Sequence, residues 1–297
     1  MDGLILVDKP EGWTSHDAVS YIRGVLEEKR VGHTGTLDPA ATGLLLVLVG
    51  RATRLARYFG PDDKEYLAVM RLGAETDTQD GEGKVIRECH VPALTASDVL
   101  AVFARFTGEI SQTPPMYSAI KRGGRPLYAH ARAGRTVEVG PRRVFVHRLE
   151  LTRLDGPLVE FKTLCSKGTY IRTLARDMGE ALGSCAHLFS LRRTHVGGHR
   201  VEDAIPLAGR PGAEEILEKA LPLTEMLPGF PSVVVNDSAA RRVGDGRAPA
   251  REDMAAFPEG LETGAPVRVL GPDGRMLAVA EATSEYGDPL VLRVVLA

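Results

Sequence analysis

One loop of the chain gathers several side chains that could do chemistry. The segment GHTGTLDPAATG, residues 32–43, holds one carboxylate, one imidazole and several hydroxyls, and its glycines let the backbone pack closely against a ligand. Pro39 biases the backbone of Asp38 toward an extended conformation, so the carboxylate is presented from a stiff loop. Such a carboxylate suits a nucleophile or a general base. The plainer alternative is that Asp38 closes an Asx-turn.

Other chemistries lack the residues that they need. The loop does not end in Gly-Lys-Ser or Gly-Lys-Thr, which excludes a P-loop for nucleotide triphosphates, and no GxSxG motif supports a serine nucleophile. His195 and His199 have the spacing of zinc ligands on a helix, but the Val-Gly-Gly between them opposes a helix. The acidic residues 73–83 do not form a calcium loop, because Gly81 offers no side-chain oxygen where a ligand is needed. The sequence therefore predicts no metal site.

The composition is that of an ordinary globular protein, with 43% hydrophobic and 26% charged residues. The longest apolar run, residues 44–49, is too short to span a bilayer, and the chain opens on strand-like residues 4–7 instead of a secretion signal. We therefore expect a soluble, cytoplasmic protein. Cys89, Cys165 and Cys185 are odd in number and lack CxxC spacing, which argues against a disulfide framework and predicts buried, reduced thiols.

The net charge of −2 hides a local asymmetry. Residues 121–148 contain one acid, Glu138, and a stripe of basic side chains: Lys121, Arg122, Arg125, Arg132, Arg135, Arg142, Arg143 and Arg148. A basic stripe is the expected footprint of a phosphate backbone. The alternative is a solvated face whose arginines pair with acids elsewhere, and charge alone does not decide between the two.

The elements that must position the loop mix helices and strands. Ser15 is the predicted N-cap of a helix with apolar residues on one face: Ala18, Val19, Ile22, Val25 and Leu26. Helices are also expected at residues 52–59 and 97–107, and strands at residues 44–49, 65–72, 144–151 and 159–165. Because strands and helices do not alternate regularly, we predict an α+β fold on a mixed, mainly antiparallel sheet.

A second, smaller domain is predicted at the C-terminal end. Prolines cluster around one short helix at residues 213–220, which indicates a linker region. Beyond it, short strands are expected at residues 233–235, 267–270, 276–281 and 290–296. A Pro-Asp-Gly turn joins two of them. We place the boundary between a catalytic domain, 1–230, and an all-β domain, 231–297.

Six segments occur in order along the chain: KPEGWTSHDAV, GHTGTLDPAATGLL, KEYLAVMRLGAETDTQDGEG, TPPMYSAIKRGGRPLYAHAR, CSKGTYIRTLARDMG and AHLFSLRRTHVGG. Together they closely resemble the TruB family of tRNA pseudouridine-55 synthases, densely over roughly residues 3–200 and loosely beyond. The resemblance implies a pseudouridine-synthase catalytic domain followed by a PUA-like β domain. It also implies an isomerase that converts uridine 55 in the T-loop of tRNA to pseudouridine without any cofactor.

The resemblance assigns roles to the residues that match the family motifs. It implies that Asp38 is the catalytic aspartate, that Arg172 pairs with its carboxylate and that Tyr66 stacks on the target base. Tyr170 would lie in the same pocket, on the same face as Arg172 if this segment is a strand. A guanidinium beside Asp38 should lower the pKa of the carboxyl from about 3.9 and keep it ionised.

Further residues are expected to bind the RNA. The resemblance implies that His33 helps to hold the flipped T-loop nucleotides and that Leu191 forms an apolar wall, while Lys9 and Pro10 match a block of structural support. Contacts to the RNA backbone are expected from an insertion at about residues 111–148 and from the two arginines that follow Leu191. The residues are Lys121, Arg122, Arg142, Arg143, Arg192 and Arg193.

The partner that this resemblance implies is the T arm of tRNA, bound by a monomer without a guide RNA and without a membrane. The compact length and the lack of basic tails favour this stand-alone bacterial type over guide-dependent relatives. A tRNA-folding factor without catalysis is the alternative. A nucleoside hydrolase is disfavoured, because the clustered aspartates that would bind calcium are absent from the sequence.

Overall fold

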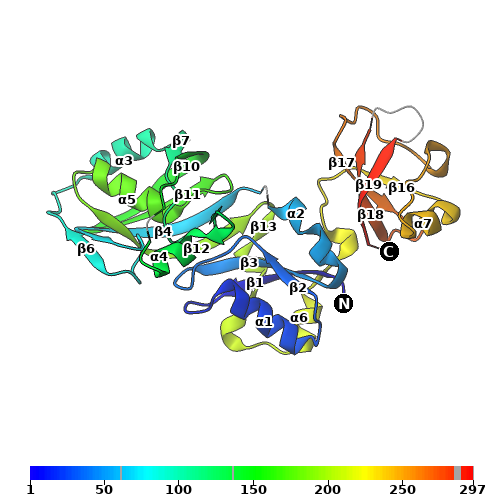
Figure 1. Cartoon of the computed structure of the whole chain (residues 1–297), viewed down its shortest axis with the longest axis horizontal. Helices are drawn as coiled ribbons and strands as arrows, with labels where there is room; N and C mark the ends of the chain where they lie inside the picture. The colour runs from blue at the N-terminus through cyan, green and yellow to red at the C-terminus, as the bar shows by residue number, and fades with distance from the viewer. Residues whose placement is uncertain (61, 136, 284–288, 297) are drawn as a thin grey trace.

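The computed structural model describes residues 1–60, 62–135, 137–283 and 289–296. Residue 136 of the predicted insertion, and residues 284–288 and 297 of the predicted C-terminal domain, lie outside the described residues. A large central sheet dominates the fold (Figure 1). Its strands are β1 (Gly3–Lys9), β2 (Val31–Thr34), β3 (Thr42–Val49), β4 (Lys64–Leu72), β7 (Gly108–Gln112), β10 (Arg142–Asp155), β11 (Leu158–Cys165), β12 (Ala186–Val196), β13 (His199–Arg200), β14 (Ile205–Pro206) and β15 (Leu221–Pro222).

The strand order of this sheet is β14-β1-β3-β12-β4-β11-β10-β7, with β2 beside β3, β13 beside β12 and β15 beside β1. Two pairs, β1 with β14 and β3 with β12, are parallel, and the described remainder are antiparallel. The predicted mixed, mainly antiparallel sheet is therefore confirmed. On β11, Val159, Phe161 and Cys165 are buried and their neighbours are partly exposed, as expected for a strand with one face on the core.

Helices supply the core on one face of the sheet. The helices are α1 (Ser15–Val25), α2 (Ala56–Phe59), α3 (Ala96–Arg105), α4 (Leu127–Arg132), α5 (Ile171–Ala181), α6 (Ala213–Glu218) and α7 (Asp237–Gly244). Ile22 of α1, Phe103 of α3 and Leu174 of α5 belong to one buried cluster with the central strands. Thr14, not Ser15, caps α1 in a capping box. The helix predicted at residues 52–59 is a 3-10 helix, Gly50–Leu55, followed by α2.

A second sheet follows near the C-terminus and packs on the opposite face of β1 and β3. It contains β16 (Ser232–Val234), β17 (Pro266–Leu270), β18 (Met276–Ala282) and β19 (Leu290–Val295). One side of this sheet packs with α7, which the sequence did not predict. From the other side, Val279 and Val294 join a buried cluster with Leu4 and Leu46. The two sheets therefore share an apolar core.

Two hairpins lie outside both sheets. They are β5 (Ala74–Thr76) with β6 (Val85–Glu88), and β8 (Lys121–Arg122) with β9 (Arg125–Pro126). The first follows the central strand β4 directly and belongs to the site described below. Among the helices of the described residues, none has both the length and the hydropathy needed to cross a membrane.

Candidate active site

Buried side chains hold the loop between β2 and β3 that carries Asp38. The hydroxyl of Ser15 accepts the N–H of Leu37 at 2.8 Å and donates to the carbonyl of Leu37 at 3.1 Å. Lys9 is 0% exposed, and its Nζ donates to the carbonyl of Pro39 at 3.2 Å and to two further carbonyls. Burial lowers the pKa of Lys9 to about 8. The backbone on both sides of Asp38 is therefore fixed.

Arg172 contacts Asp38 and is itself held at several points. Its Nε lies 3.1 Å from Oδ2 of Asp38. Its terminal nitrogens donate to the carbonyl of Thr78 at 3.1 Å and to the carbonyl of Tyr117 at 2.7 Å. One of them also lies 3.3 Å from Oδ2 of Asp80. Because the Arg172 side chain is only 8% exposed, these contacts fix the orientation of the guanidinium toward Asp38.

Asp80 belongs to this site although the sequence did not single it out. Its second oxygen, Oδ1, accepts the hydroxyl of Thr78 at 2.6 Å and the N–H of Glu82 at 3.1 Å. The carboxylate is therefore fixed by its own loop while it faces Arg172. The sequence predicts an acidic loop without a calcium site at residues 73–83. The sequence around Asp80 gives no sign that this acid pairs with Arg172, which is 92 residues away.

Arg172 comes from the first turn of α5 and not from a strand. Tyr170 is the N-cap residue, and α5 begins at Ile171. The condition under which Tyr170 and Arg172 would share one face of a strand is therefore not met, because apolar residues recur at helical spacing from Ile171 onward and bury one side of a helix. Gln112 fixes the backbone of Tyr170. Its side-chain amide accepts the Tyr170 N–H at 2.7 Å and donates to the Tyr170 carbonyl at 3.0 Å. The sequence did not predict this role for Gln112.

The surroundings of Asp38 raise the pKa of its carboxyl. Burial in the pocket is the largest cause, Arg172 opposes it and the neighbouring carboxylate of Asp80 adds to it. The prediction of a lowered pKa for Asp38 is therefore wrong, because the loss of solvation outweighs the ion pair with Arg172. The Asp38 side chain nevertheless keeps 42% of its surface exposed at the pocket. Asp38 is therefore a stronger base than a free aspartate and is accessible to a substrate.

A pocket opens over Asp38. Its polar side is formed by Asp38, Asp80 and Arg172, and its apolar side by residues of β12 that include Leu188, Phe189 and Leu191. A wider groove adjoins the pocket along β12 and extends past Leu67 to Arg192. The site therefore combines one accessible carboxylate, one fixed guanidinium and an apolar wall.

Tyr66 and His33 lie outside the lining of this pocket. Tyr66, on β4, is 8% exposed; burial raises the pKa of its hydroxyl, and the nearby guanidinium of Arg193 opposes the rise. His33, on β2, is partly buried, and burial with the nearby Arg193 lowers the pKa of its ring. Within the described residues, Nδ1 of His33 has no hydrogen-bond partner. Of the residues with predicted roles around the uracil, Asp38, Arg172 and Leu191 line the pocket, and Tyr66 lies close enough to Asp38 for that carboxylate to add to the rise in its pKa.

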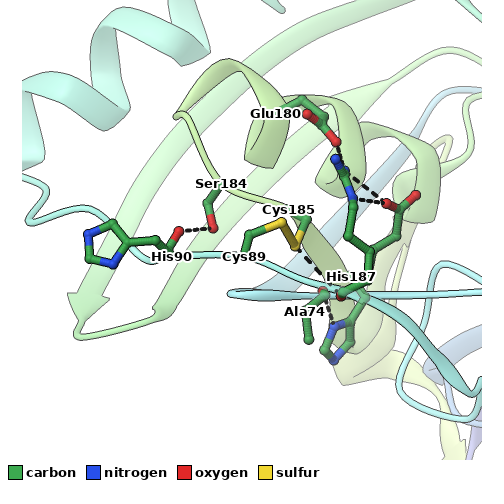
Figure 2. Close-up of a disulfide and its surroundings, with 9 residues drawn as sticks. Ala74, Cys89, His90, Glu180, Ser184, Cys185 and His187 are labelled. Atoms are coloured by element: carbon green, nitrogen blue, oxygen red, sulfur yellow. Dashed lines mark hydrogen bonds and ion pairs between the residues drawn. A yellow bond between two sulfur atoms is a disulfide. The ribbon is translucent and has the colours of Figure 1, made fainter.

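A disulfide lies at the base of the hairpin that leads to Asp80. Cys89, which follows β6, is bonded to Cys185, which precedes β12 (Figure 2). The prediction of three reduced thiols is therefore wrong for this pair. The fold brings together two cysteines that are 96 residues apart, and their spacing in the sequence carries no sign of it. Cys165 is free and buried, as expected.

Hydrogen bonds reinforce this attachment on both sides of the disulfide (Figure 2). Ser184 donates its hydroxyl to the carbonyl of His90 at 2.9 Å, and Nδ1 of His187 lies 2.8 Å from the carbonyl of Ala74. The N–H of Leu188 donates to the carbonyl of Gln79 at 3.0 Å, next to Asp80. The hairpin is thus joined to the turn between α5 and β12, which are the elements that supply Arg172 and Leu191.

The predicted RNA contacts differ in their surroundings. Lys121, Arg122 and Arg142 are exposed and form no ion pair within the described residues. The exposed Arg143 pairs with Glu109 at 3.3 Å. The side chain of Arg132 lies outside the described residues. The alternative, in which arginines pair with acids, therefore applies to Arg143, while the RNA contacts of the unpaired residues stay a prediction.

The two arginines that follow Leu191 are placed very differently. Arg192 is partly exposed and pairs with Asp8 at 2.6 Å. Arg193 is 1% exposed, so it has no surface to offer a phosphate. The prediction that Arg193 contacts the RNA backbone is therefore corrected: its neighbours on β3 and β4 bury it inside the protein.

Comparison with known proteins identifies the family. Residues 23–171 match the model of the TruB family pseudouridylate synthase N-terminal domain, and residues 172–209 match the tRNA pseudouridylate synthase B C-terminal domain. The chain is 45% identical over 285 residues to tRNA pseudouridine synthase B of Burkholderia mallei, an alignment that covers 95% of this chain and 94% of the relative. The chain belongs to the TruB family. This TruB protein is thus an isomerase of the tRNA pseudouridine synthase class.

Further relatives agree with the TruB assignment. The tRNA pseudouridine synthase B of Cupriavidus metallidurans is 44% identical over 295 residues, covering 94% of this chain and 90% of the relative. Among solved structures, an H/ACA ribonucleoprotein bound to a substrate RNA containing 2'-deoxyuridine is similar with a TM-score of 0.75 and 27% identity, over 99% of this chain and 85% of that one. The expected α+β pseudouridine-synthase fold is confirmed. In the described part of this TruB protein, no group of three or more His, Cys, Asp or Glu side chains is arranged to hold a metal.

Proposed function

We propose that this TruB protein isomerises uridine 55 in the T-loop of tRNA to pseudouridine, with Asp38 as its catalytic carboxylate. The observation that carries the proposal is the contact between Asp38 and the buried Arg172 in a pocket with an apolar wall. A carboxylate with a fixed orientation and raised basicity meets the needs of a nucleophile or base. The name tRNA pseudouridine synthase B, carried by relatives with 45% identity, supports tRNA as the substrate.

The reaction breaks the bond between C1′ and N1, turns the uracil and joins C1′ to C5. The proton on C5 leaves and N1 gains one, so the reaction involves no net oxidation or reduction, and we propose that it needs no cofactor. Asp38 could attack C1′, attack the base or remove a ribose proton, and each route needs its ionised form. Arg172 stabilises that form. We assign the final removal of the C5 proton to Asp38 or Tyr66.

The target uridine must leave the folded T arm before it can reach Asp38. Flipping a base costs a few kcal/mol, and stacking on an aromatic side chain returns about 1–3 kcal/mol per base. We propose that Tyr66 stacks on the base, that Leu191 forms the wall beside it, and that Tyr170 and His33 support the flipped nucleotides. Phe189, which is 52% exposed at the pocket, offers a further aromatic surface.

We propose that exposed basic residues of the insertion at about residues 111–148, together with Arg192, hold the phosphates of the T arm. The residues in question are Lys121, Arg122, Arg142, Arg143 and Arg192. Their charges would attract RNA without reading its sequence. The catalytic domain would span residues 1–230, and residues 231–297 would form a PUA-like domain that contacts the tRNA away from the T-loop.

We further propose that the protein acts as a monomer without a guide RNA. The similar H/ACA ribonucleoprotein is 27% identical to this chain, whereas the bacterial synthase is 45% identical over nearly its full length. The greater similarity to the bacterial enzymes supports the stand-alone type. Modification of a tRNA transcript by the purified chain alone would test this part of the proposal.

The role of Asp38 is tested with tRNA that carries tritium at C5 of its uridines. The wild-type protein should release one equivalent of tritium per tRNA. Asp38→Asn should release none, while the dissociation constant for tRNA changes by less than about twofold, because phosphate contacts dominate binding. Asp177→Asn on α5, whose carboxylate pairs with Arg176, is the matched control and should behave as wild type. Turnover by Asp38→Asn would refute the role, and binding without release by the wild type would favour a tRNA-folding factor.

A further inference from the structure

Arg193 is the largest of the nearly inaccessible side chains in the described residues, with 1% of its surface exposed. It forms no ion pair among them. Burial of a guanidinium is costly unless its N–H groups find acceptors. The acceptors that Arg193 uses therefore indicate what the fold gains from this arginine.

The acceptors of Arg193 lie at the two ends of the loop that carries Asp38. Its Nε donates to the carbonyl of Leu44 at 2.7 Å, and a terminal nitrogen donates to the carbonyl of Gly35 at 3.0 Å. The planar guanidinium of Arg193 thus links Gly35, directly after β2, to Leu44, within β3. Ser15 and Lys9 hold the middle of the same loop, at Leu37 and Pro39.

The same guanidinium lies near the hydroxyl of Tyr66 on the neighbouring strand β4, where it opposes the rise that burial causes in the pKa of that hydroxyl. Arg193 and Tyr66 are direct partners in the register of β12 and β4. Arg193 therefore contacts both the loop of the proposed catalytic carboxylate and the residue proposed to stack on the base. It lies between them and does not line the pocket.

The backbone around Arg193 is also adapted to this position. Gly43 is the register partner of Arg193 on β3, and a Cβ atom at Gly43 would lie 2.2 Å from the carbonyl oxygen of Arg193. Gly43 also has a φ of +101°, which other residues rarely adopt. The lack of a side chain at this point allows β3 and β12 to approach, and that approach brings the guanidinium under the loop.

We propose that Arg193 is a positioning residue for the TruB reaction, which sets the ends of the Asp38 loop and the phenol of Tyr66 relative to each other. It contacts neither the RNA nor the reacting atoms. The inference rests on the proposed roles of Asp38 and Tyr66. It predicts that the loss of Arg193 impairs the chemical step and leaves the binding of tRNA intact.

The test uses Arg193→Met, which keeps much of the apolar volume and removes every donor, in the full-length protein. Three quantities are measured: the melting temperature, the dissociation constant for tRNA and the rate of tritium release in a single turnover with saturating enzyme. Rates are compared well below the melting temperature of each variant, so that a folded population is assayed. We expect the rate to fall at least 10-fold and the dissociation constant to change by less than twofold.

A double-mutant cycle with Tyr66→Phe separates positioning from simple support of the fold. If Arg193 acts in part through the Tyr66 hydroxyl, Arg193→Met should slow the reaction less in the Tyr66→Phe background than in the wild type. Arg54→Met is the matched control. Arg54 also donates to a backbone carbonyl, that of Val295 at 2.7 Å, but it lines neither the pocket nor the groove, and its loss should leave the saturated rate unchanged.

Two results would overturn the proposal. A wild-type rate in folded Arg193→Met would reduce Arg193 to a support of the fold, and a weaker affinity with an unchanged saturated rate would make it an RNA ligand. If Arg193→Met does not fold, Arg193→Lys carries the same test, because lysine keeps the charge and cannot span both carbonyls. Asp38→Asn in the same assay distinguishes the two failures: its loss of activity upholds the proposed function even if Arg193 has no effect.

Discussion

Arg172→Lys tests the geometry of the site most sharply, because it keeps the charge and removes the planar fork. Arg172 reaches Asp38, Asp80 and the carbonyls of Thr78 and Tyr117 through three different nitrogens. An ammonium group is a single point and cannot hold all four acceptors, so at least two contacts should be lost. The carboxylate of Asp38 would then lose its fixed orientation.

The size of the effect follows from these contacts. A hydrogen bond that involves a charged group contributes about 1.5–3 kcal/mol. Because the Asp38 side chain is 42% exposed, solvent screens the pair and the lower end of that range applies. Two lost contacts then amount to about 3 kcal/mol, which corresponds to a rate about 100-fold lower at 1.36 kcal/mol per factor of ten.

The assay is single-turnover tritium release with saturating enzyme, beside a measurement of tRNA affinity. Arg172→Lys should lower the rate about 100-fold and change the dissociation constant by less than about threefold. Arg176→Lys is the control, since Arg176 lies one turn further along α5 and pairs with Asp177. A rate for Arg172→Lys within threefold of wild type would show that the fork beside Asp38 is not needed for the reaction.

Three further perturbations test other parts of the structure. Asp80→Asn removes a negative charge that raises the pKa of Asp38. In a pH–rate profile, the pH at which the rate falls on acidification should therefore move lower. A midpoint that stays in place or moves higher would contradict this. Reduction of the Cys89–Cys185 disulfide opens a loop closed by residues 96 apart, and the lost cross-link costs up to about 4–5 kcal/mol of stability. The melting temperature should therefore fall by several degrees in dithiothreitol. An equal melting temperature with and without reductant would exclude a stabilising bond. Removal of residues 231–297 uncovers Leu4 and Leu46, so the truncated chain should melt at a lower temperature. Its KM should rise for full-length tRNA but not for a T-arm stem-loop. An equal rise in KM for both substrates would refute a remote contact with tRNA.

The sequence predicted the elements whose signal is local. The strand at β4, the helix at α3 and the α+β class follow from periodicity and from the spacing of turns, and the structure contains them. Asp38 stands out because glycines and a proline surround it in a stiff loop. Its partner Arg172 was reached through the resemblance to the TruB family and not through spacing, since 134 residues separate the two in the sequence.

The features that the sequence did not predict all depend on contacts between distant segments. Arg193 looks like any other arginine on a strand, and its burial depends on the carbonyls of Gly35 and Leu44. Asp80 is one acid among several in its loop until the fold places Arg172 beside it. The pKa of Asp38 was misjudged for the same reason, because desolvation depends on everything that packs around the pocket.

The central claim, that this chain converts uridine 55 of tRNA to pseudouridine by means of Asp38, is tested most directly by mapping the product. An unmodified tRNA transcript is incubated with the purified protein, without any added cofactor, and pseudouridine is located by sequencing at single-nucleotide resolution. We expect pseudouridine at position 55 with the wild-type protein, and none there with Asp38→Asn. Unmodified uridine at position 55 after incubation with the wild-type protein, or pseudouridine at that position with Asp38→Asn, would contradict the claim.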